Sequence, residues 1–481
     1  MSLNFSFNLG PQRNPGDPKP EPGEPFRILV LGDFSGRTNR DAPADPSFRP
    51  RRKADLDTTD ELPEEFGTTV RTAGGVEIGI EELDHFHPDE LYRRVPVFAA
   101  LRDLRKRLND QSTFAAAAAE VAGMTGAAPA EESASKAKAD DFSSLLESGF
   151  GQAGSPASPA VDALVRAALA PHIVPADDPR KPELIATVDA AIGEQMRTIL
   201  RDDQWAHTES CWLGLRRLVT QLELDEELTC HAADVTLADL AADAEGGARG
   251  IDALLDGPAR GEPPIAVAVV CARFDGSTAS IKTLAALAAV AHRTGCCVVA
   301  GAHDRLLGVE SLAATPDARD WSADPIGDGG EAWAALRTRA EASSLCLVAP
   351  RHLARLPYGE KTDEIDAFPF EEVGDGSDGD VVHEHHVWTA GSIMVAEAFG
   401  KAFTRSGWSS RPEGSARIDD LPVRVLADKT MLPCAEAWIT ETTAEAMLSR
   451  GITPVVSVRG AGEALVGPIR AINREGLKTA W

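Results

Sequence analysis

A glycine-bounded turn after an apolar run is the part of this sequence whose residue types come nearest to nucleotide chemistry. The run ILVL at 28–31 leads into GDFSG at 32–36, and turns at the start of a helix bind phosphate in many α/β proteins. A P-loop needs GxxxxGK followed by Ser or Thr, and a dinucleotide-binding turn needs three glycines. Because the turn fits neither pattern, we predict a structural turn in which Asp33 accepts hydrogen bonds from local backbone N–H groups. An enzyme that binds a nucleotide through residues 26–37 is the alternative.

Two histidine-rich stretches contain residue types that bind metal ions. If HEHH at 383–386 were a strand, successive side chains would point to opposite faces. We therefore predict a solvated loop before Trp388 and keep a metal site as the alternative. In HFHP at 85–88, the proline fits the first position of a helix, which predicts a helix start there.

The seven cysteines lie mostly in apolar runs, at positions 211, 230, 271, 296, 297, 346 and 434. Their spacing is not that of a CxxC redox pair or of a zinc site, so we predict buried, reduced thiols. A local nucleophile motif such as GxSxG is also missing from the sequence. We therefore expect no catalytic, cofactor-binding or metal-binding residues, and a protein that is not an enzyme.

The charge balance argues against polyanionic partners. The 481 residues include 48 Lys and Arg against 75 Asp and Glu, a formal net charge of -27. Binding to nucleic acid or to an anionic membrane surface needs clustered positive charge. The first residues do not have the pattern of a secretory signal peptide, and no apolar run reaches the ~18 residues of a membrane span. We expect a cytoplasmic protein with no nucleic-acid partner and no membrane insertion.

Composition divides the chain into three segments that must position these residues. Residues 1–110 contain the apolar strand at 28–31 and a later helical run. Residues 111–160 are rich in Ala, Ser, Gly and Pro, which predicts a linker, with one short amphipathic turn in DDFSSLLESGF at 140–150. Residues 161–481 alternate apolar strand-like runs with helical runs. This alternation predicts an α/β fold with mixed sheets covered by helices on both sides.

Helical spacing of apolar residues is clearest in four runs. They are Val97, Leu101, Leu104 and Leu108; Leu184, Val188, Ile192, Met196 and Ile199; Trp205, Trp212, Leu215 and Val219; and Ile281, Leu284, Leu287 and Val290.

Two parts of the chain resemble the two subunits of the type VI secretion contractile sheath. Residues 25–37 (PFRILVLGDFSGR) and 80–108 (IEELDHFHPDELYRRVPVFAALRDLRKRL) resemble the small subunit. Four blocks, at 190–219, 347–373, 396–408 and 432–460, resemble the large subunit in the same order. Among them are Trp212-x-Gly-Leu and the stretch PRHLARLPYG at 350–359. The chain thus resembles a natural fusion of a small-subunit-like domain, 1–110, and a C-terminally shortened large-subunit-like domain, 161–481.

The resemblance implies a structural protein that self-associates into a helical tube or rings and has no enzymatic activity. An inner tube protein, baseplate components and an AAA+ unfoldase are the further partners that it implies. Because the large-subunit-like part ends early, we expect an assembly that does not contract. A non-polymerising scaffold or interaction protein that kept the sheath fold is the alternative.

Two groups of apolar side chains are the candidate contact residues under this resemblance. The strand-like LNFSFNLG at 3–10 would extend a neighbouring subunit's sheet by strand addition, and the amphipathic turn at 140–150 would contact the unfoldase. The residues are Leu3, Phe5 and Phe7 for the inter-subunit strand, and Phe142, Leu145 and Leu146 for the unfoldase contact.

Overall fold

The chain passes back and forth between two structural units. The computed structural model describes residues 23–40, 42–110, 112–124, 181–257, 261–374, 382–410 and 414–479. Unit 1 comprises Met1–Phe66, His207–Leu356 and Val387–Trp481, and unit 2 comprises Gly67–Ala206 and Pro357–His386. Each unit combines chain from before residue 110 with chain from after residue 160, so the units cut across the segment boundaries expected from the sequence. The predicted domain boundaries near residues 110 and 160 stay a prediction.

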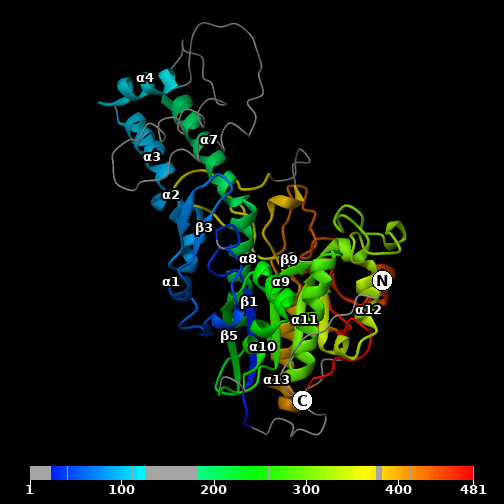
Figure 1. Ribbon diagram of the computed structural model, residues 1–481. Helices are drawn as coiled ribbons and strands as arrows, with labels where there is room; N and C mark the ends of the chain where they lie inside the picture. The colour runs from blue at the N-terminus through cyan, green and yellow to red at the C-terminus, as the bar shows by residue number, and fades with distance from the viewer. Residues whose placement is uncertain are drawn as a thin grey trace. The chain divides into compact units, whose positions relative to one another are not determined.

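The sheet of unit 1 contains strand β1 in its interior. In spatial order, its nine strands within the described chain are β11 (Ala416–Ile418), β13 (Ala464–Val466), β12 (Ile452–Ser457), β8 (Leu345–Ala349), β7 (Cys297–Ala302), β6 (Val267–Phe274), β1 (Phe26–Gly32), β5 (Leu228–Asp234) and β2 (Arg51–Ala54). The strands from β12 to β5 are parallel, whereas β2, β13 and β11 are antiparallel to their neighbours. Figure 1 shows the blue β1 beside the green β5. The expected α/β fold with a large mixed sheet is confirmed.

Helices cover both faces of this sheet. Because side chains alternate along a strand, Leu29 and Leu31 of β1 join one apolar core with α9 (Leu237–Gly246), α10 (Arg249–Leu255), α11 (Thr278–Thr294) and α12 (Gly330–Arg337). On the other face, the ring of Phe26 lies 4.8 Å from that of Phe403 in α13 (Ser392–Ser406), centroid to centroid. A strand covered on both faces is mostly apolar, and all of β1 is buried, as expected. Its one charged residue, Arg27, pairs with Glu262 at 2.9 Å.

The remaining helices and strands of unit 1 include one long helix, α8. They are α1 (Leu62–Phe66), α14 (Glu441–Ser449), the paired strands β9 (His352–Leu353) and β10 (Trp388–Thr389), and α8 (Asp203–Gln221), which starts in unit 2 and continues in unit 1. Trp212 and Leu215 of α8 are fully buried, and the predicted helical runs at 205–219 and 281–290 are both confirmed.

The order of the parallel strands fixes where a ligand would bind. In the parallel part of the sheet, the chain forms β1, β5, β6, β7 and β8 in that order. Across the sheet, they lie in the order β5, β1, β6, β7, β8, so the second strand made lies outside the first. This is a doubly wound order, and such sheets bind ligands outside the carboxyl ends of the strands where the winding reverses. Here that position is between β1 and β6. The turn GDFSG follows directly from the carboxyl end of β1.

Unit 2 contains a β-hairpin and a set of helices. The hairpin strands are β3 (Thr69–Arg71) and β4 (Glu77–Gly79), and the helices are α2 (Pro88–Arg94), α3 (Pro96–Asn109), α4 (Phe114–Met124) and α7 (Lys181–Leu200). The predicted apolar faces at 97–108 and 184–199 are buried, and Arg105 of α3 pairs with Asp189 of α7 at 2.5 Å. As predicted, a helix begins at Pro88, and His87 accepts a hydrogen bond from the N–H of Asp89. Within the described ranges, no helix combines the length and apolar character needed to cross a membrane.

The interior position of β1 generates a stability prediction. We expect Ile28→Ala to lower the free energy of unfolding of unit 1 by about 2–5 kcal/mol, because Ile28 is fully buried and the change leaves a cavity. Leu56→Ala is the control, since Leu56 is 71% exposed. Urea unfolding would measure both, and hydrogen exchange should quicken in β5 and β6 of the Ile28 variant. Unchanged exchange in those two strands would contradict the pairing.

Candidate functional site

The turn after β1 is closed by its own first carboxylate. Asp33 accepts hydrogen bonds from the backbone N–H of Arg37 at 2.9 Å and of Thr38 at 3.0 Å, and from the hydroxyl of Thr38. Gly36 has a φ of 67°, a backbone conformation that favours glycine. The predicted role of Asp33 is therefore confirmed.

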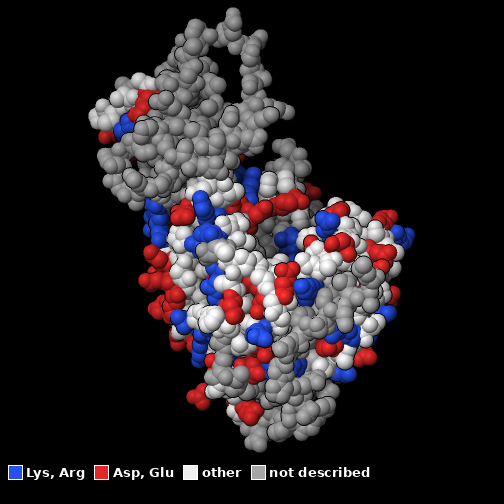
Figure 2. All heavy atoms as spheres, in the orientation of Figure 1, with Lys and Arg blue, Asp and Glu red and all other residues white. Residues whose placement is uncertain are grey.

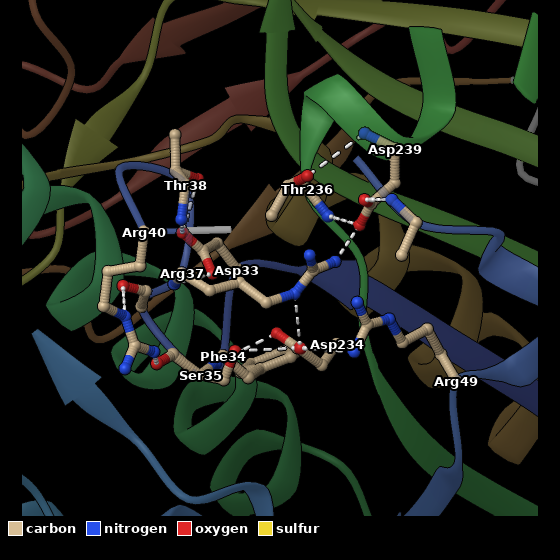
Figure 3. Close-up of polar contacts among 12 residues, drawn as sticks. Asp33, Phe34, Ser35, Arg37, Thr38, Arg40, Arg49, Asp234, Thr236 and Asp239 are labelled. Carbon is tan, nitrogen blue, oxygen red and sulfur yellow. Dashed lines mark hydrogen bonds and ion pairs between the residues drawn. The ribbon is translucent and has the colours of Figure 1, made fainter. Parts of the chain in front are cut away.

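A second carboxylate reaches the turn from the neighbouring strand. Asp234, the last residue of β5, accepts hydrogen bonds from the N–H of Ser35 at 3.0 Å, from its hydroxyl at 2.9 Å and from Nε of Arg37 at 3.1 Å. Arg37 also pairs with Asp239 of α9, which accepts the N–H of Ala44 at 2.7 Å. Figure 3 shows Arg37 between Asp234 and Asp239, with Ser35 beneath.

These contacts use the groups that a phosphate would need. Phosphate-binding turns present free backbone N–H groups to the ligand. Here the N–H groups of Ser35, Arg37 and Thr38 all donate to carboxylates of the chain itself. The turn thus acts as a link between β1, β5 and α9, and an incoming anion would have to displace Asp33 or Asp234.

The charges in this link are stabilised by their partners. Burial alone would raise the pKa of Asp33, but hydrogen bonds from the Thr38 hydroxyl and from the two backbone N–H groups outweigh it and hold that pKa below its ordinary value. Burial would likewise lower the pKa of Arg37, yet the charges of Asp239 and Asp234 raise it. Both residues are therefore ionised in the folded protein at neutral pH.

The helix after β6 shows the same arrangement. The N–H of Thr278, the first residue of α11, donates to Asp328 at 2.8 Å, and the N–H of Ser277 donates to Asp275 at 3.0 Å. Carboxylates of the chain therefore occupy the anion position on both sides of the point where the winding reverses.

Residues of the large-subunit-like blocks hold α8 against this region. The indole N–H of Trp212 donates to the carbonyl of Phe34 at 3.0 Å. A Cβ on Gly214 would lie 3.1 Å from side-chain atoms of Ile393 and Thr389, so glycine permits this close approach. Arg355 pairs with the buried Glu209 at 2.6 Å. In the structure, these residues of the sheath-like sequence blocks make packing, hydrogen-bond and ion-pair contacts within the fold.

The other predicted site residues have different outcomes. Leu3, Phe5, Phe7, Phe142, Leu145 and Leu146 lie outside the described residues. HEHH at 383–386 forms a short 3₁₀ helix at His383–His385, and His386 is buried, so this stretch is more ordered than the predicted loop. The seven cysteines are buried free thiols, as predicted. In the described ranges, no three His, Cys, Asp or Glu side chains are placed to hold a metal ion.

Sequence reasoning missed the partners of Arg37. Asp239 could have been found as part of a helix start, because Thr236 and Asp239 form a capping box at the beginning of α9. For Asp234, the sequence shows only a polar residue at the end of an apolar run, which does not predict a partner. No local pattern links either residue to a turn about 200 positions earlier.

The charged surface is mixed on the face drawn in Figure 2. Lys and Arg side chains lie between Asp and Glu side chains there, and an acidic group lies where Figure 1 places α1. Asp57, Asp60, Glu61, Glu64 and Glu65 are the exposed acidic residues of this stretch.

The link between β1 and β5 predicts a large effect of Asp234→Ala. We expect the free energy of unfolding to fall by about 3–5 kcal/mol, because the change leaves the buried Arg37 and Ser35 without this acceptor. Asp419→Ala is the matched control. Asp419 pairs with Arg417 on the surface, where such pairs contribute about 0–1 kcal/mol. Equal losses from the two changes, measured by chemical unfolding, would show that the link does not stabilise the fold.

The lowered pKa of Asp33 predicts a dependence of stability on pH. A carboxyl group whose pKa is lower in the folded state adds stability above its unfolded pKa of about 3.9, and this stability is lost as the pH falls through the folded value. We therefore expect Asp33→Asn to be less stable than the wild-type protein at pH 5–7, with a difference that narrows below pH 4. Unfolding curves at several pH values measure this difference. A constant difference from pH 7 to pH 3 would contradict the prediction.

Comparison with known proteins places this fold in a family. Residues 182–468 match the model of the EvpB/VC_A0108 tail sheath N-terminal domain. The type VI secretion system sheath protein TssC1 of Pseudomonas aeruginosa is 28% identical over 291 residues, which are 57% of this chain and 57% of that relative. The chain thus spans little more than half of the length of this curated relative.

The family model lies within the segment that resembles the large sheath subunit, and the resemblance is confirmed there at the level of the family. Because the match extends over more than half of the sequence, the chain belongs to the EvpB/VC_A0108 tail sheath family.

Proposed function

We propose that this protein is a structural subunit that polymerises into a helical tube or rings related to the type VI secretion sheath. The family match over residues 182–468 is the observation that carries the proposal. In a filament, one surface of each subunit contacts a different surface of the next, and the contact repeats without closing.

The site geometry supports a structural role over a catalytic one. The backbone donors of the turn after β1 are used by Asp33 and Asp234, and the start of α11 is used by Asp328. A nucleotide would have to replace these internal hydrogen bonds, each of which involves a charged acceptor. Saturable binding of a nucleotide in a titration of the full chain would favour the nucleotide-binding alternative.

We also propose that the chain is a natural fusion of the two sheath subunits. The small-subunit-like turn at 32–36 follows β1, and β1 lies between β5 and β6 of the large-subunit-like segment. A fusion would supply β1 to this sheet within one chain, at a fixed ratio of one to one. The segment boundaries near residues 110 and 160 belong to this proposal.

The proposed partners follow from the family and not from a contact in the structure. Another copy of the chain is the first, and an inner tube protein, baseplate components and an AAA+ unfoldase are the others. We propose Phe142, Leu145 and Leu146 as the unfoldase contact and Leu3, Phe5 and Phe7 as the strand added to a neighbour.

Electron microscopy of the purified full chain tests the proposal. We expect tubes or stacked rings, and longer ones in moderate salt, because salt screens repulsion between subunits with a net charge of -27. A concentration-independent monomer in light scattering would favour the scaffold alternative. The absence of contraction stays a prediction, and two populations of tubes with different diameter and subunit rise would contradict it.

Deleting residues 2–9 tests the inter-subunit strand. We expect a folded protein that no longer forms long polymers, because strand addition supplies main-chain hydrogen bonds between subunits. Replacing Asn4 and Asn8 by Ser is the control, since it keeps Leu3, Phe5 and Phe7. Tubes of normal length from the deletion variant would exclude this role.

A further inference from the structure

A pocket of unit 1 is lined in part by polar groups that have no partner among the described residues. It has a volume of about 280 Å³ and lies between α8, strands β9 and β10, and the loop at Asp420 and Pro422. Its polar lining consists of Arg216, Arg217, Thr220, Gln221, His352 and Asp420, besides the hydroxyl of a threonine in β10.

Arg216 is the positively charged residue of this pocket that has no partner among the described residues. It is exposed on α8, and in the described part of the chain its guanidinium makes no hydrogen bond or ion pair. A free guanidinium presents a planar set of donors that matches a carboxylate. Gln221, five residues further along the same helix, also has an amide without a partner among the described residues.

The neighbouring Arg217 is fixed by the fold. Its Nε lies 2.8 Å from Glu397, which is fully buried and also pairs with Lys401 at 2.6 Å. Arg217 further donates to the carbonyls of Asp419 and Asp420 at 2.7 and 2.9 Å. Two cations therefore share the Glu397 carboxylate, and the positive charge of Arg216 adds to theirs.

His352 provides a second, independent sign of an unfilled site. His352 is 2% exposed and lines the pocket, yet its Nδ1 has no hydrogen-bond partner in the part of the chain that the structure describes. Burial, helped by the charge of Arg217, lowers its pKa to about 3, so the ring is neutral at pH 7. A buried polar atom without a partner costs free energy, so the wall of the pocket contains a polar group whose burial is not offset by the described residues.

We propose that this pocket binds an Asp or Glu side chain of a second copy of this chain. The carboxylate would accept hydrogen bonds from Arg216 and Gln221, while Asp420 at the rim accepts a backbone N–H of the same incoming segment. This choice of occupant rests on the proposed self-assembly. It is also supported by charge, because 75 acidic residues against 48 basic ones leave many carboxylates without a cation. Asp57, Asp60, Glu61 and Glu64 at α1 are exposed examples, whereas Glu65 pairs with Arg52.

The first experiment compares the self-association of three chains by light scattering and electron microscopy. Arg216→Gln should raise the concentration needed for assembly roughly tenfold. The loss of a hydrogen bond to a charged group weakens an association constant by about this factor or more. Arg249→Gln is the matched control: Arg249 is exposed on α10, has no partner in the described ranges and does not line the pocket. Its assembly should be unchanged. Identical assembly of the wild-type protein and the Arg216 variant would overturn the assignment to a second copy.

The second experiment tests the pocket without assembly. Saturation-transfer NMR with N-acetyl-L-glutamate should detect binding to the wild-type chain and at least a tenfold weaker response with Arg216→Gln, whereas N-acetyl-L-glutamine should bind weakly to both. Equal binding to the two chains would overturn the carboxylate site. A wild-type chain that stays monomeric would contradict the proposed function and the choice of occupant, while this NMR comparison would still decide whether the pocket binds a carboxylate.

Discussion

The parallel pairing of β1 with β5 and β6 is the contact on which the rest of unit 1 depends. β1 lies between the two strands, with Val30 paired to Ala232 on one side and to Val269 on the other. Without it, β5 and β2 would have no backbone connection to the other strands of the sheet. The apolar cores on both faces also lose a central strand, because the side chains of β1 contribute alternately to each face.

The buried carboxylates around the turn at 32–36 lose hydration on folding and gain hydrogen bonds and ion pairs. Burying Asp33, Asp234 and Asp239 removes charge from water, and only complete pairing offsets the loss of hydration. The fold meets this condition with Arg37 and with backbone N–H groups. The result is a doubly wound sheet whose usual ligand position is occupied by carboxylates of its own chain.

The elements of the fold could be predicted from the sequence, but their arrangement could not. Buried strands such as FRILVLG and helices with a regular apolar face carry local signals, and the structure confirms them. The role of Asp33 was predictable because its partners Arg37 and Thr38 are close in sequence. The pairing of Phe26 with Leu228, and of Arg37 with Asp234 and Asp239, joins residues about 200 positions apart. Periodicity carries no information about such contacts. Nor could the sequence show that Arg217 pairs with Glu397 while its neighbour Arg216 has no partner among the described residues.

The position of β1 also constrains the time course of folding during protein synthesis. β1 is made first, but both of its neighbours, β5 and β6, are made only after the chain has passed residues 228 and 267. At about 5–20 residues per second, the ribosome takes roughly 10–40 s to add the 200 residues between β1 and β5. Throughout this interval a strand that is apolar except for Arg27 has neither of its native edges covered, and exposed apolar strands are prone to pair with other chains. During translation, β1 of one nascent chain must therefore stay unpaired with β1 of the chains made by neighbouring ribosomes on the same messenger RNA. This holds until β5 and β6 have been synthesised.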